Sequence, residues 1–248
     1  MKIREFYKRL IHLISVPKCV CCKEKLDFDD RGLCRDCMEK YMEHKKRNCD
    51  RCSRILSACS CSSTYLSSHG VKRLIKVFRY FKREQSLASN YLIYSLKQDN
   101  REDVISFLTE EMVAALNNSI DFSKGKYIFT NVPRRRKSII NYGFDHAAVL
   151  AKSVSKAIGC EYRDLLVSKS KRSQKSVIGS ERVHNAVFDY KHRREISLKG
   201  YTVILVDDIV TTGASMSSCA MLLRGMGTKT VIGATLGVAL KSSGFKTK

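Results

Sequence analysis

Residues 203–215 (VILVDDIVTTGAS) constrain the fold more than any other stretch of this chain. The four apolar residues at the start are typical of a strand that is buried on both faces. Asp207 and Asp208 follow at the predicted end of this strand, and a segment with two threonines and a glycine then leads into a helix. The order strand, turn, helix predicts a parallel α/β sheet, in which ligands bind at the carboxyl ends of the strands.

The chain after residue 70 keeps the same alternating pattern. Some segments have apolar residues at helical spacing, whereas others are short apolar runs bounded by Pro or Gly. We predict helices over residues 84–98, 101–116 and 144–158 and after residue 215, a long loop over residues 167–185, and strands over residues 126–132 and 230–239. The predicted fold is a mostly parallel sheet with helices on both faces, over residues 70–240.

The end of the predicted strand has groups suited to a phosphorylated sugar. A helix N-terminus offers free N–H groups to a phosphate, and Gly213 lets the backbone come close to a ligand. The hydroxyls of Thr211, Thr212 and Ser215 add donors, while the two carboxylates accept from a diol and would lie beside any Mg²⁺ that the ligand carries. If the acids only capped a turn, one acid and one hydroxyl would suffice. The pattern therefore favours phosphorylated ribose.

Nine of the eleven cysteines lie between residues 19 and 61, where eight of them form four close pairs and Cys21 is a spare. A CxxC turn places two thiolates on one side of a tetrahedral Zn²⁺, so two pairs close one structural site. Redox-active or reactive thiols are the alternative for a single pair, but four pairs favour metal. We expect chelation to unfold residues 19–61 and to spare the remainder. The candidate ligands in this module, residues 19–63, are Cys19, Cys22, Cys34, Cys37, Cys49, Cys52, Cys59 and Cys61.

The first residues of the chain have apolar side chains at helical spacing, which predicts an amphipathic helix within residues 1–18. Such a helix packs on the protein or, as the alternative, lies on a membrane surface. No apolar run reaches the roughly 18 residues of a membrane helix, and the short apolar stretch lacks a cleavage signal. Together with paired rather than spread cysteines, these features favour a cytoplasmic location.

The formal net charge of +22 favours phosphate-rich partners, although a solubilising surface would also explain it. Residues 71–83 contain six basic and three aromatic residues and no acid, and residues 134–137 are four basic residues in a row. Basic and aromatic side chains together are typical of surfaces that bind single-stranded DNA. The alternative is that the aromatic residues belong to the core and the charges are solvated. The candidate nucleic-acid residues are Lys72, Arg73, Lys76, Arg79, Tyr80 and Lys82.

Residues 203–215 resemble the signature of type I phosphoribosyltransferases, and further segments narrow the resemblance to the ComF family, which is associated with competence and the use of imported DNA. Val132-Pro133 with the basic residues that follow resembles the family's pyrophosphate loop, and Arg79-Tyr80 stands where Lys-Tyr is usual. The resemblance includes the family's double zinc ribbon and covers nearly all of residues 19–240. The family's flexible loop also has a similar segment in this chain, which contains Gln174, Glu181, Arg182, Asn185 and Phe188.

The resemblance implies binding of phosphoribosyl pyrophosphate (PRPP) with Mg²⁺. Asp207 and Asp208 would hold the ribose hydroxyls as the catalytic pair, and residues 211–215 would wrap the 5′-phosphate. If transfer occurs, pyrophosphate leaves the anomeric carbon through a cation-like centre, which positioning and charge neutralisation assist. The candidate PRPP-binding residues are Pro133, Arg134, Lys171, Arg182, Asp207, Asp208, Ile209, Val210, Thr211, Thr212, Gly213, Ala214 and Ser215.

The chain departs from the family at residues 142–146, which read Tyr-Gly-Phe-Asp-His where Arg-Gly-Phe-Asn-Gln is usual. This change affects the acceptor side of the pocket, and no residue identifies an acceptor. The first hypothesis is a PRPP-binding protein of DNA uptake that binds single-stranded DNA and works with competence or DNA-processing proteins. The alternatives are a nucleic-acid-binding adaptor with a non-catalytic PRPP fold and a nucleobase salvage enzyme. The cysteine module and the charge count against salvage.

Overall fold

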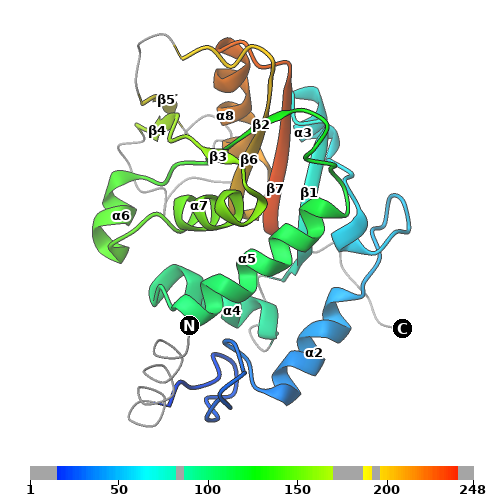
Figure 1. The fold of residues 1–248 in the computed structure, drawn as a ribbon, viewed down its shortest axis with the longest axis vertical. Helices are drawn as coiled ribbons and strands as arrows, with labels where there is room; N and C mark the ends of the chain where they lie inside the picture. Colours follow the sequence, from blue (N-terminus) through cyan, green and yellow to red (C-terminus); the bar gives the residue numbers. More distant parts are fainter. Residues whose placement is uncertain (1–15, 82–86, 170–186, 192–195, 240–248) are drawn as a thin grey trace.

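The computed structural model describes residues 16–81, 87–169, 187–191 and 196–239. At its centre lies a five-stranded sheet with the strand order β1-β7-β6-β2-β3, in which every neighbouring pair is parallel. The parallel α/β sheet predicted from the sequence is therefore confirmed (Figure 1). The strands are β1 (Arg73–Tyr80), β2 (Lys126–Asn131), β3 (Glu161–Tyr162), β6 (Tyr201–Val210) and β7 (Thr230–Ala239).

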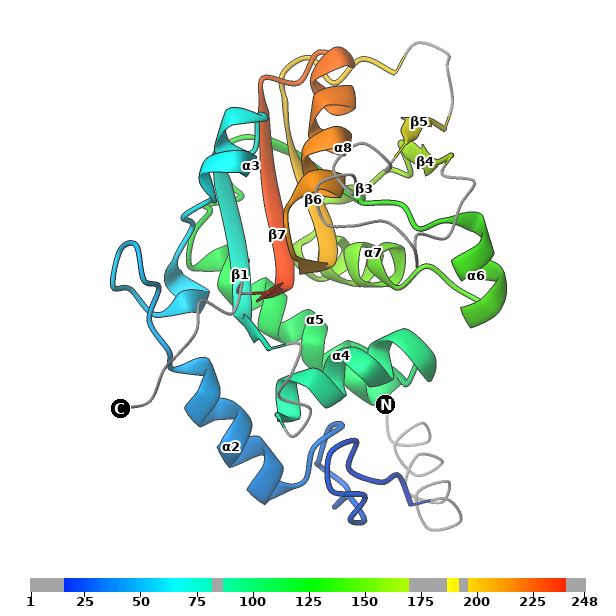
Figure 2. The same cartoon turned by 180° about the vertical axis from the view of Figure 1, so that it is seen from behind.

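Helices cover both faces of the sheet, as Figures 1 and 2 show. Because side chains alternate along a strand, Ile204 and Val206 of β6 join one core with α4, α5 and α7, while Val203 and Leu205 join the other with α3 and α8. The helices are α3 (Thr64–Ser68), α4 (Ala88–Gln98), α5 (Glu102–Asn117), α7 (His146–Ile158) and α8 (Ala214–Gly225). The helices predicted after residue 84 are confirmed within the described residues.

The cysteine module contains helix α2 (Arg35–Lys45) and a 3₁₀ turn (Leu56–Ala58). Residues 57–68 are not the simple linker that their serines suggest, because they contain α3. Ser63 caps this helix by accepting a hydrogen bond from the backbone N–H of Leu66, and Leu66 is buried against α8. The connection is thus part of the domain core.

Two short strands flank the segment expected to be a long loop. β4 (Leu166–Ser168) pairs antiparallel with β5 (Phe188–Tyr190), so the loop predicted from residue 167 begins after β4. Residues 170–186 lie outside the described residues, as do residues 1–15 with most of the predicted N-terminal helix. Among the described helices, none has the length and hydropathy needed to cross a bilayer.

Candidate functional site

Strand β6 carries both aspartates and continues beyond them to Val210. The predicted end of the strand before Asp207 is wrong, because pairing with β7 continues through Val210 opposite Val238. The Thr235 hydroxyl also donates to the backbone carbonyl of Asp208 at 3.0 Å. The sheet therefore fixes the backbone of the aspartate pair, and alternation along the strand directs the two side chains to different surroundings.

The segment after β6 forms a small pocket at the start of α8. A hollow of about 40 Å³ is lined by Asp207 and residues 209–216, which is room for one small group such as a phosphate. Gly213 caps α8 with a φ of +86°, a left-handed conformation that favours glycine. A Cβ at Gly213 would also lie 2.7 Å from Cγ of Leu66. The packing of α3 therefore requires this glycine in addition to the ligand approach expected from the sequence.

Asp208 is the centre of a charged cluster drawn from four elements. Its side chain is 8% exposed, and its Oδ2 atom lies 2.9 Å from Nη2 of Arg134 and 3.1 Å from Nζ of Lys97 in α4. Nε2 of His146 in α7 lies 3.7 Å from the same oxygen. Sequence reasoning anticipated Arg134 but missed Lys97, because nothing in the pattern of α4 shows that its last turn reaches the end of β6.

The two carboxyl groups have opposite pKa shifts. Burial, together with the charge of Asp208, raises the pKa of Asp207 well above its usual range. Burial also acts on Asp208, but the charges of Lys97 and Arg134 outweigh it and lower the pKa of this group. The negative charge of the pair is therefore favoured on Asp208, and protonation is favoured on Asp207.

The departure at residues 142–146 has a structural role. Asp145 caps α7 by accepting from the backbone N–H groups of Ala147 and Ala148 at 3.1 and 3.2 Å, and it accepts from the backbone N–H of Arg134 at 2.9 Å. It thus ties the predicted pyrophosphate loop to α7. His146 is fully buried, and neither of its ring nitrogens has a hydrogen-bond partner among the described residues.

The structure locates part of the predicted PRPP site. Val132 and Pro133 follow β2, and Arg134 reaches the aspartate pair from there. Asp207 and residues 209–215 lie together around the small pocket. Lys171 and Arg182 lie outside the described residues, as does Lys82 of the nucleic-acid prediction.

The cysteine pairs form two separate clusters. Cys19, Cys22, Cys34 and Cys37 make up the first cluster, and Cys49, Cys52, Cys59 and Cys61 the second; within each, the sulfur atoms lie within 4.8 Å of one another. Four thiolates at this separation suit a tetrahedral ion such as Zn²⁺. Both clusters could hold zinc, and the structure joins the first pair to the second and the third pair to the fourth, a grouping that the spacing left open.

The two clusters are built on the same backbone turn. In the first, the N–H of Lys23 donates to the carbonyl of Cys19, and in the second the N–H of Ser53 donates to the carbonyl of Cys49, at 3.1 and 2.9 Å. Lys23 and Ser53 both have positive φ, at 69° and 57°. This repeated turn brings the two sulfur atoms of a CxxC pair to one side, which supports metal binding independently of the cysteine count.

The described part of the proposed nucleic-acid segment, residues 71–81, is largely inside the protein. It forms β1, which is packed on both faces, so Lys76 and Phe78 are only 5% and 2% exposed. Nζ of Lys76 donates to the carbonyl of Cys61 at 2.7 Å, and Nη2 of Arg73 donates to the carbonyl of Ser119 at 2.6 Å. The prediction that Lys76 contacts DNA is therefore wrong. For Phe78 the alternative holds, namely that the aromatic residues of this segment belong to the core.

Arg79 and Tyr80, which belong to the same prediction, are partly buried, whereas Lys72 is exposed to solvent. Nη2 of Arg79 donates to the carbonyl of Asn48 at 2.6 Å and pairs with Asp50. A continuous basic and aromatic surface along β1 is thus not formed by these residues.

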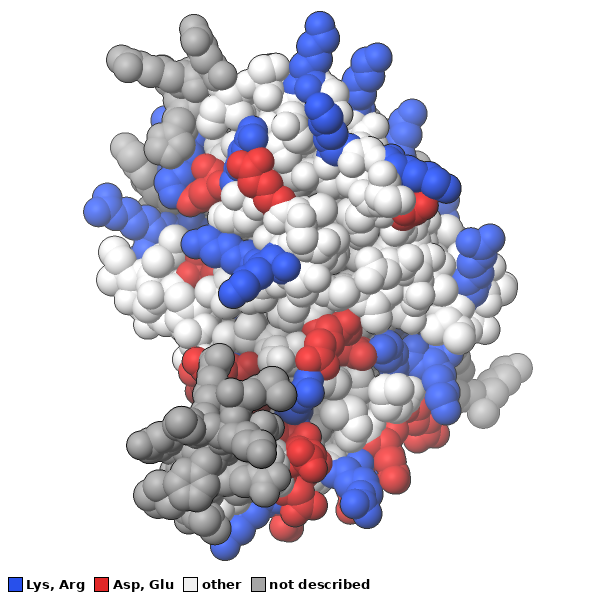
Figure 3. All heavy atoms as spheres, in the orientation of Figure 1, with Lys and Arg blue, Asp and Glu red and all other residues white. Residues whose placement is uncertain are grey.

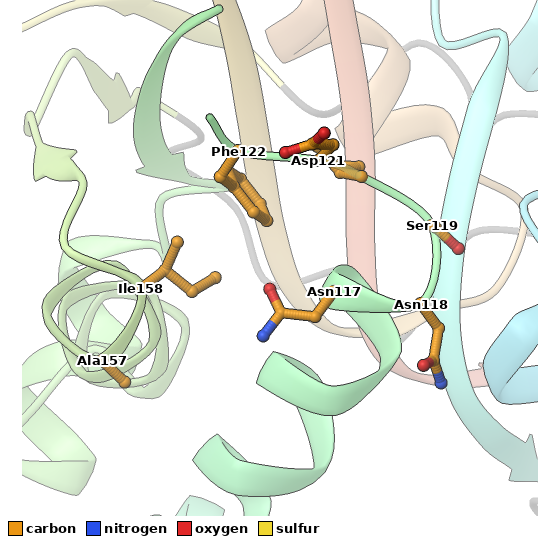
Figure 4. A pocket seen from close by; sticks show the side chains of 8 residues that line it. Asn117, Asn118, Ser119, Asp121, Phe122, Ala157 and Ile158 are labelled. Carbon is orange, nitrogen blue, oxygen red and sulfur yellow. The ribbon is translucent and has the colours of Figure 1, made fainter. Parts of the chain in front are cut away.

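A larger hollow is lined by none of the predicted PRPP-binding residues or cysteine ligands. It measures about 550 Å³ and is lined by residues 117–122 and the end of α7, as Figure 4 shows. It opens before the amino end of β2, whereas the aspartate pair and the small pocket lie toward the carboxyl ends of the strands. The volume of a hollow is therefore not what marks the candidate site, and the charge cluster on Asp208 is the better guide.

Comparisons with known proteins agree with the site. Residues 145–244 match the family model for the phosphoribosyl transferase domain. The chain is 28% identical over 207 residues to the competence protein ComFC of Streptococcus pneumoniae, which covers 82% of this chain and 86% of that protein. It is 22% identical over 225 residues to the DNA utilization protein YhgH of Escherichia coli K12, covering 88% and 96%.

A hypoxanthine phosphoribosyltransferase of Staphylococcus aureus is among the similar solved structures, with a TM-score of 0.37 and 16% identity over 54% of this chain and 62% of that chain. The two named relatives and the family model bear on identity more directly. With the aspartate pair on β6, the loop that follows it and the two cysteine clusters, they support the resemblance of this chain to ComF-type proteins with a phosphoribosyl transferase domain.

Proposed function

We propose that this protein binds PRPP with Mg²⁺ at residues 207–215, with Arg134 at the pyrophosphate. The observation that carries the proposal is the juxtaposition of a small pocket at a helix N-terminus with a carboxyl pair of opposite pKa shifts. The 5′-phosphate fits the pocket because backbone N–H groups at the start of α8 face an anion there. The ribose diol fits the pair because the ionised, accepting form is favoured for Asp208 and the protonated form, which can donate, is favoured for Asp207.

The role that we propose for this binding is DNA uptake or use in the cytoplasm. The names of the two relatives, a competence protein and a DNA utilization protein, support it. The cysteines among the described residues form no disulfides, which agrees with a reducing compartment. We also propose Zn²⁺ in both cysteine clusters, in a structural role, because four thiolates leave no open coordination position.

Titration calorimetry with PRPP, with and without Mg²⁺, tests the binding. We expect wild-type protein to bind PRPP, and the double change Asp207→Asn with Asp208→Asn to reduce affinity by about a hundredfold or more, because each amide replaces a group that the diol and the ion require. Asp121→Asn is the control, since it removes an exposed acid that lies before β2. Unchanged affinity in a folded double variant would rule out this site.

A second candidate activity is binding of single-stranded DNA at helix α6 (Arg136–Tyr142), in place of β1. None of the seven residues of this helix is buried. Arg136 and Lys137 are exposed, and Tyr142 and Ile140 are 44% and 72% exposed. Basic groups beside an exposed aromatic ring suit a phosphate backbone with stacked bases. On the face drawn in Figure 3, basic and acidic side chains of the described residues are interspersed, so a local surface is favoured over a general charge effect.

Fluorescence anisotropy with a labelled oligonucleotide tests this surface. If about six phosphates are neutralised, affinity should fall on the order of a thousandfold between 50 and 200 mM salt. The double change Arg136→Ala with Lys137→Ala should reduce the salt slope by about two, since each lost phosphate contact lowers it by about one. Lys72→Ala is the control, because Lys72 is exposed just before strand β1, outside α6. An unchanged slope in the α6 variant would exclude this helix as the DNA surface.

A further inference from the structure

Asp208 has more positive charge around it than one carboxylate needs. Both Lys97 and Arg134 lie within ion-pair distance of the same oxygen, Oδ2, at 3.1 and 2.9 Å. Among the described residues, Asp208 is the acidic group that pairs with Lys97, and the same oxygen also pairs with Arg134. Two cations that meet on one carboxylate oxygen leave positive charge available to an anion.

Lys97 reaches this cluster from a different part of the chain than the predicted PRPP residues. It lies in the last turn of α4, and its side chain is 30% exposed although its ammonium group touches a nearly buried carboxylate. A lysine in this position has one side toward Asp208 and the other toward solvent, from which a ligand would enter. The ammonium can therefore change partners without leaving the site.

The chemistry of the proposed ligand gives this cation a partner. In PRPP the pyrophosphate is attached to C1, which is bonded to C2, and C2 carries one of the two ring hydroxyls. If the diol lies on Asp207 and Asp208 as proposed above, the pyrophosphate lies on the side of the groups that already contact Asp208. Those groups are Arg134 and Lys97.

We propose that Lys97 is a pyrophosphate-binding residue of this protein, held by Asp208 before the ligand arrives and transferred to the pyrophosphate when the diol takes its place. The inference rests on the proposed PRPP site. The competing explanation is an internal ion pair that only positions Asp208, since buried ion pairs also occur without a ligand. The two explanations differ in which ligands they affect.

Ribose 5-phosphate separates them, because it has the diol and the 5′-phosphate but no pyrophosphate. Calorimetry in Mg²⁺ with wild-type protein and Lys97→Gln should show PRPP affinity lowered by about ten- to a hundredfold, as for one lost charge-assisted hydrogen bond. Affinity for ribose 5-phosphate should stay within about twofold. Lys97→Arg, which keeps the charge, should retain most of the PRPP affinity.

Lys156→Gln is the matched control, since it removes the same charge from an exposed position on α7 and should leave both affinities unchanged. Equal losses for both ligands in Lys97→Gln would show that Lys97 only positions Asp208 and would overturn the inference. An unchanged PRPP affinity would overturn it as well. Wild-type protein that binds neither ligand would instead refute the proposed PRPP site itself, so the two failures are distinguishable.

Discussion

The two cysteine clusters have the same donors and the same backbone turn but different surroundings. Around the first cluster, Val20, Leu26, Leu33 and Tyr41 are buried in a core that they share with α4 and α5. The second cluster forms a small core of its own, in which Leu56 is buried with the cysteines. The same set of four cysteines therefore lies in the continuous core of the domain in one case and in a small apolar core of its own in the other.

Polar contacts strengthen this difference. The first cluster is joined to α5 by Tyr41 and Lys45, which both bind Glu111, and by the backbone N–H of Gly32, which donates to Asp103 at 3.0 Å. The side chains of Lys45 and Glu111 are only 16% and 14% exposed. Because the same core contains α4, which carries Lys97 to Asp208, the first cluster shares its packing with the proposed PRPP site, whereas the second contacts strand β1 through Lys76 and Arg79.

The largest expected effect is the loss of metal from the first cluster. Cys37→Ser removes a buried ligand, and elemental analysis should fall from about two zinc ions per chain to about one. The loss should reduce the free energy of unfolding by on the order of 5 kcal/mol, since metal binding and folding are coupled and the core is shared. PRPP affinity should fall in parallel. The expectation that chelation spares the rest of the protein thus changes for this cluster.

Loss of metal from the second cluster should have a smaller and local effect. Cys59→Ser also removes one buried ligand and should also remove about one zinc ion, but PRPP affinity should stay within about twofold. Hydrogen exchange should increase over residues 47–61 and remain unchanged in α4 and α5. If Cys59→Ser impaired PRPP binding as strongly as Cys37→Ser, the contrast between the clusters would not hold.

The sequence predicted those features that local pattern determines. The four apolar residues of β6, the periodic helices and the cysteine spacing each depend on neighbours in the chain, so the parallel sheet and both ligand sets could be predicted. The aspartate pair and the loop after it were likewise found from composition and order. The buried position of Lys76 could not be found this way, because its partner is the carbonyl of Cys61 in another module.

The remaining site residues come from tertiary placement. Lys97 meets Asp208 only because α4 packs on the sheet, and a lysine at the end of a helix otherwise indicates a solvated charge. His146 lies on the same face of α7 as core residues, and the missing family glutamine was its one sequence signal. Leu66 was hidden in a serine-rich stretch, yet its contact with Gly213 connects α3 to the phosphate pocket.

A moderate effect is expected at the contact between the first cluster and α5. Burial, followed by the charge of Glu111, raises the pKa of Tyr41 above its usual range. The folded state thus holds the phenol proton more tightly than the unfolded chain, so this stabilisation is complete below about pH 10 and is lost as the pH rises further. Tyr41→Phe should cost about 1–2 kcal/mol at pH 7. Thermal unfolding should show the two proteins converging above pH 10, and a constant difference would contradict the assignment.

The smallest effect is expected at the surface contact of the second cluster. Asp50 is 72% exposed and pairs with Arg79 of β1, which also donates to the backbone carbonyl of Asn48. Asp50→Asn leaves that second acceptor in place, so the free energy of unfolding should fall by about 0.5 kcal/mol or less, and by less still at high salt. Asp103→Asn is the matched comparison, because Asp103 accepts from Gly32 and Arg101 in a partly buried contact of the first cluster and should cost more. Urea unfolding of both variants measures which one loses more free energy of unfolding. A larger loss for Asp50→Asn would mean that the second cluster depends on its contact with the sheet more than its small core indicates.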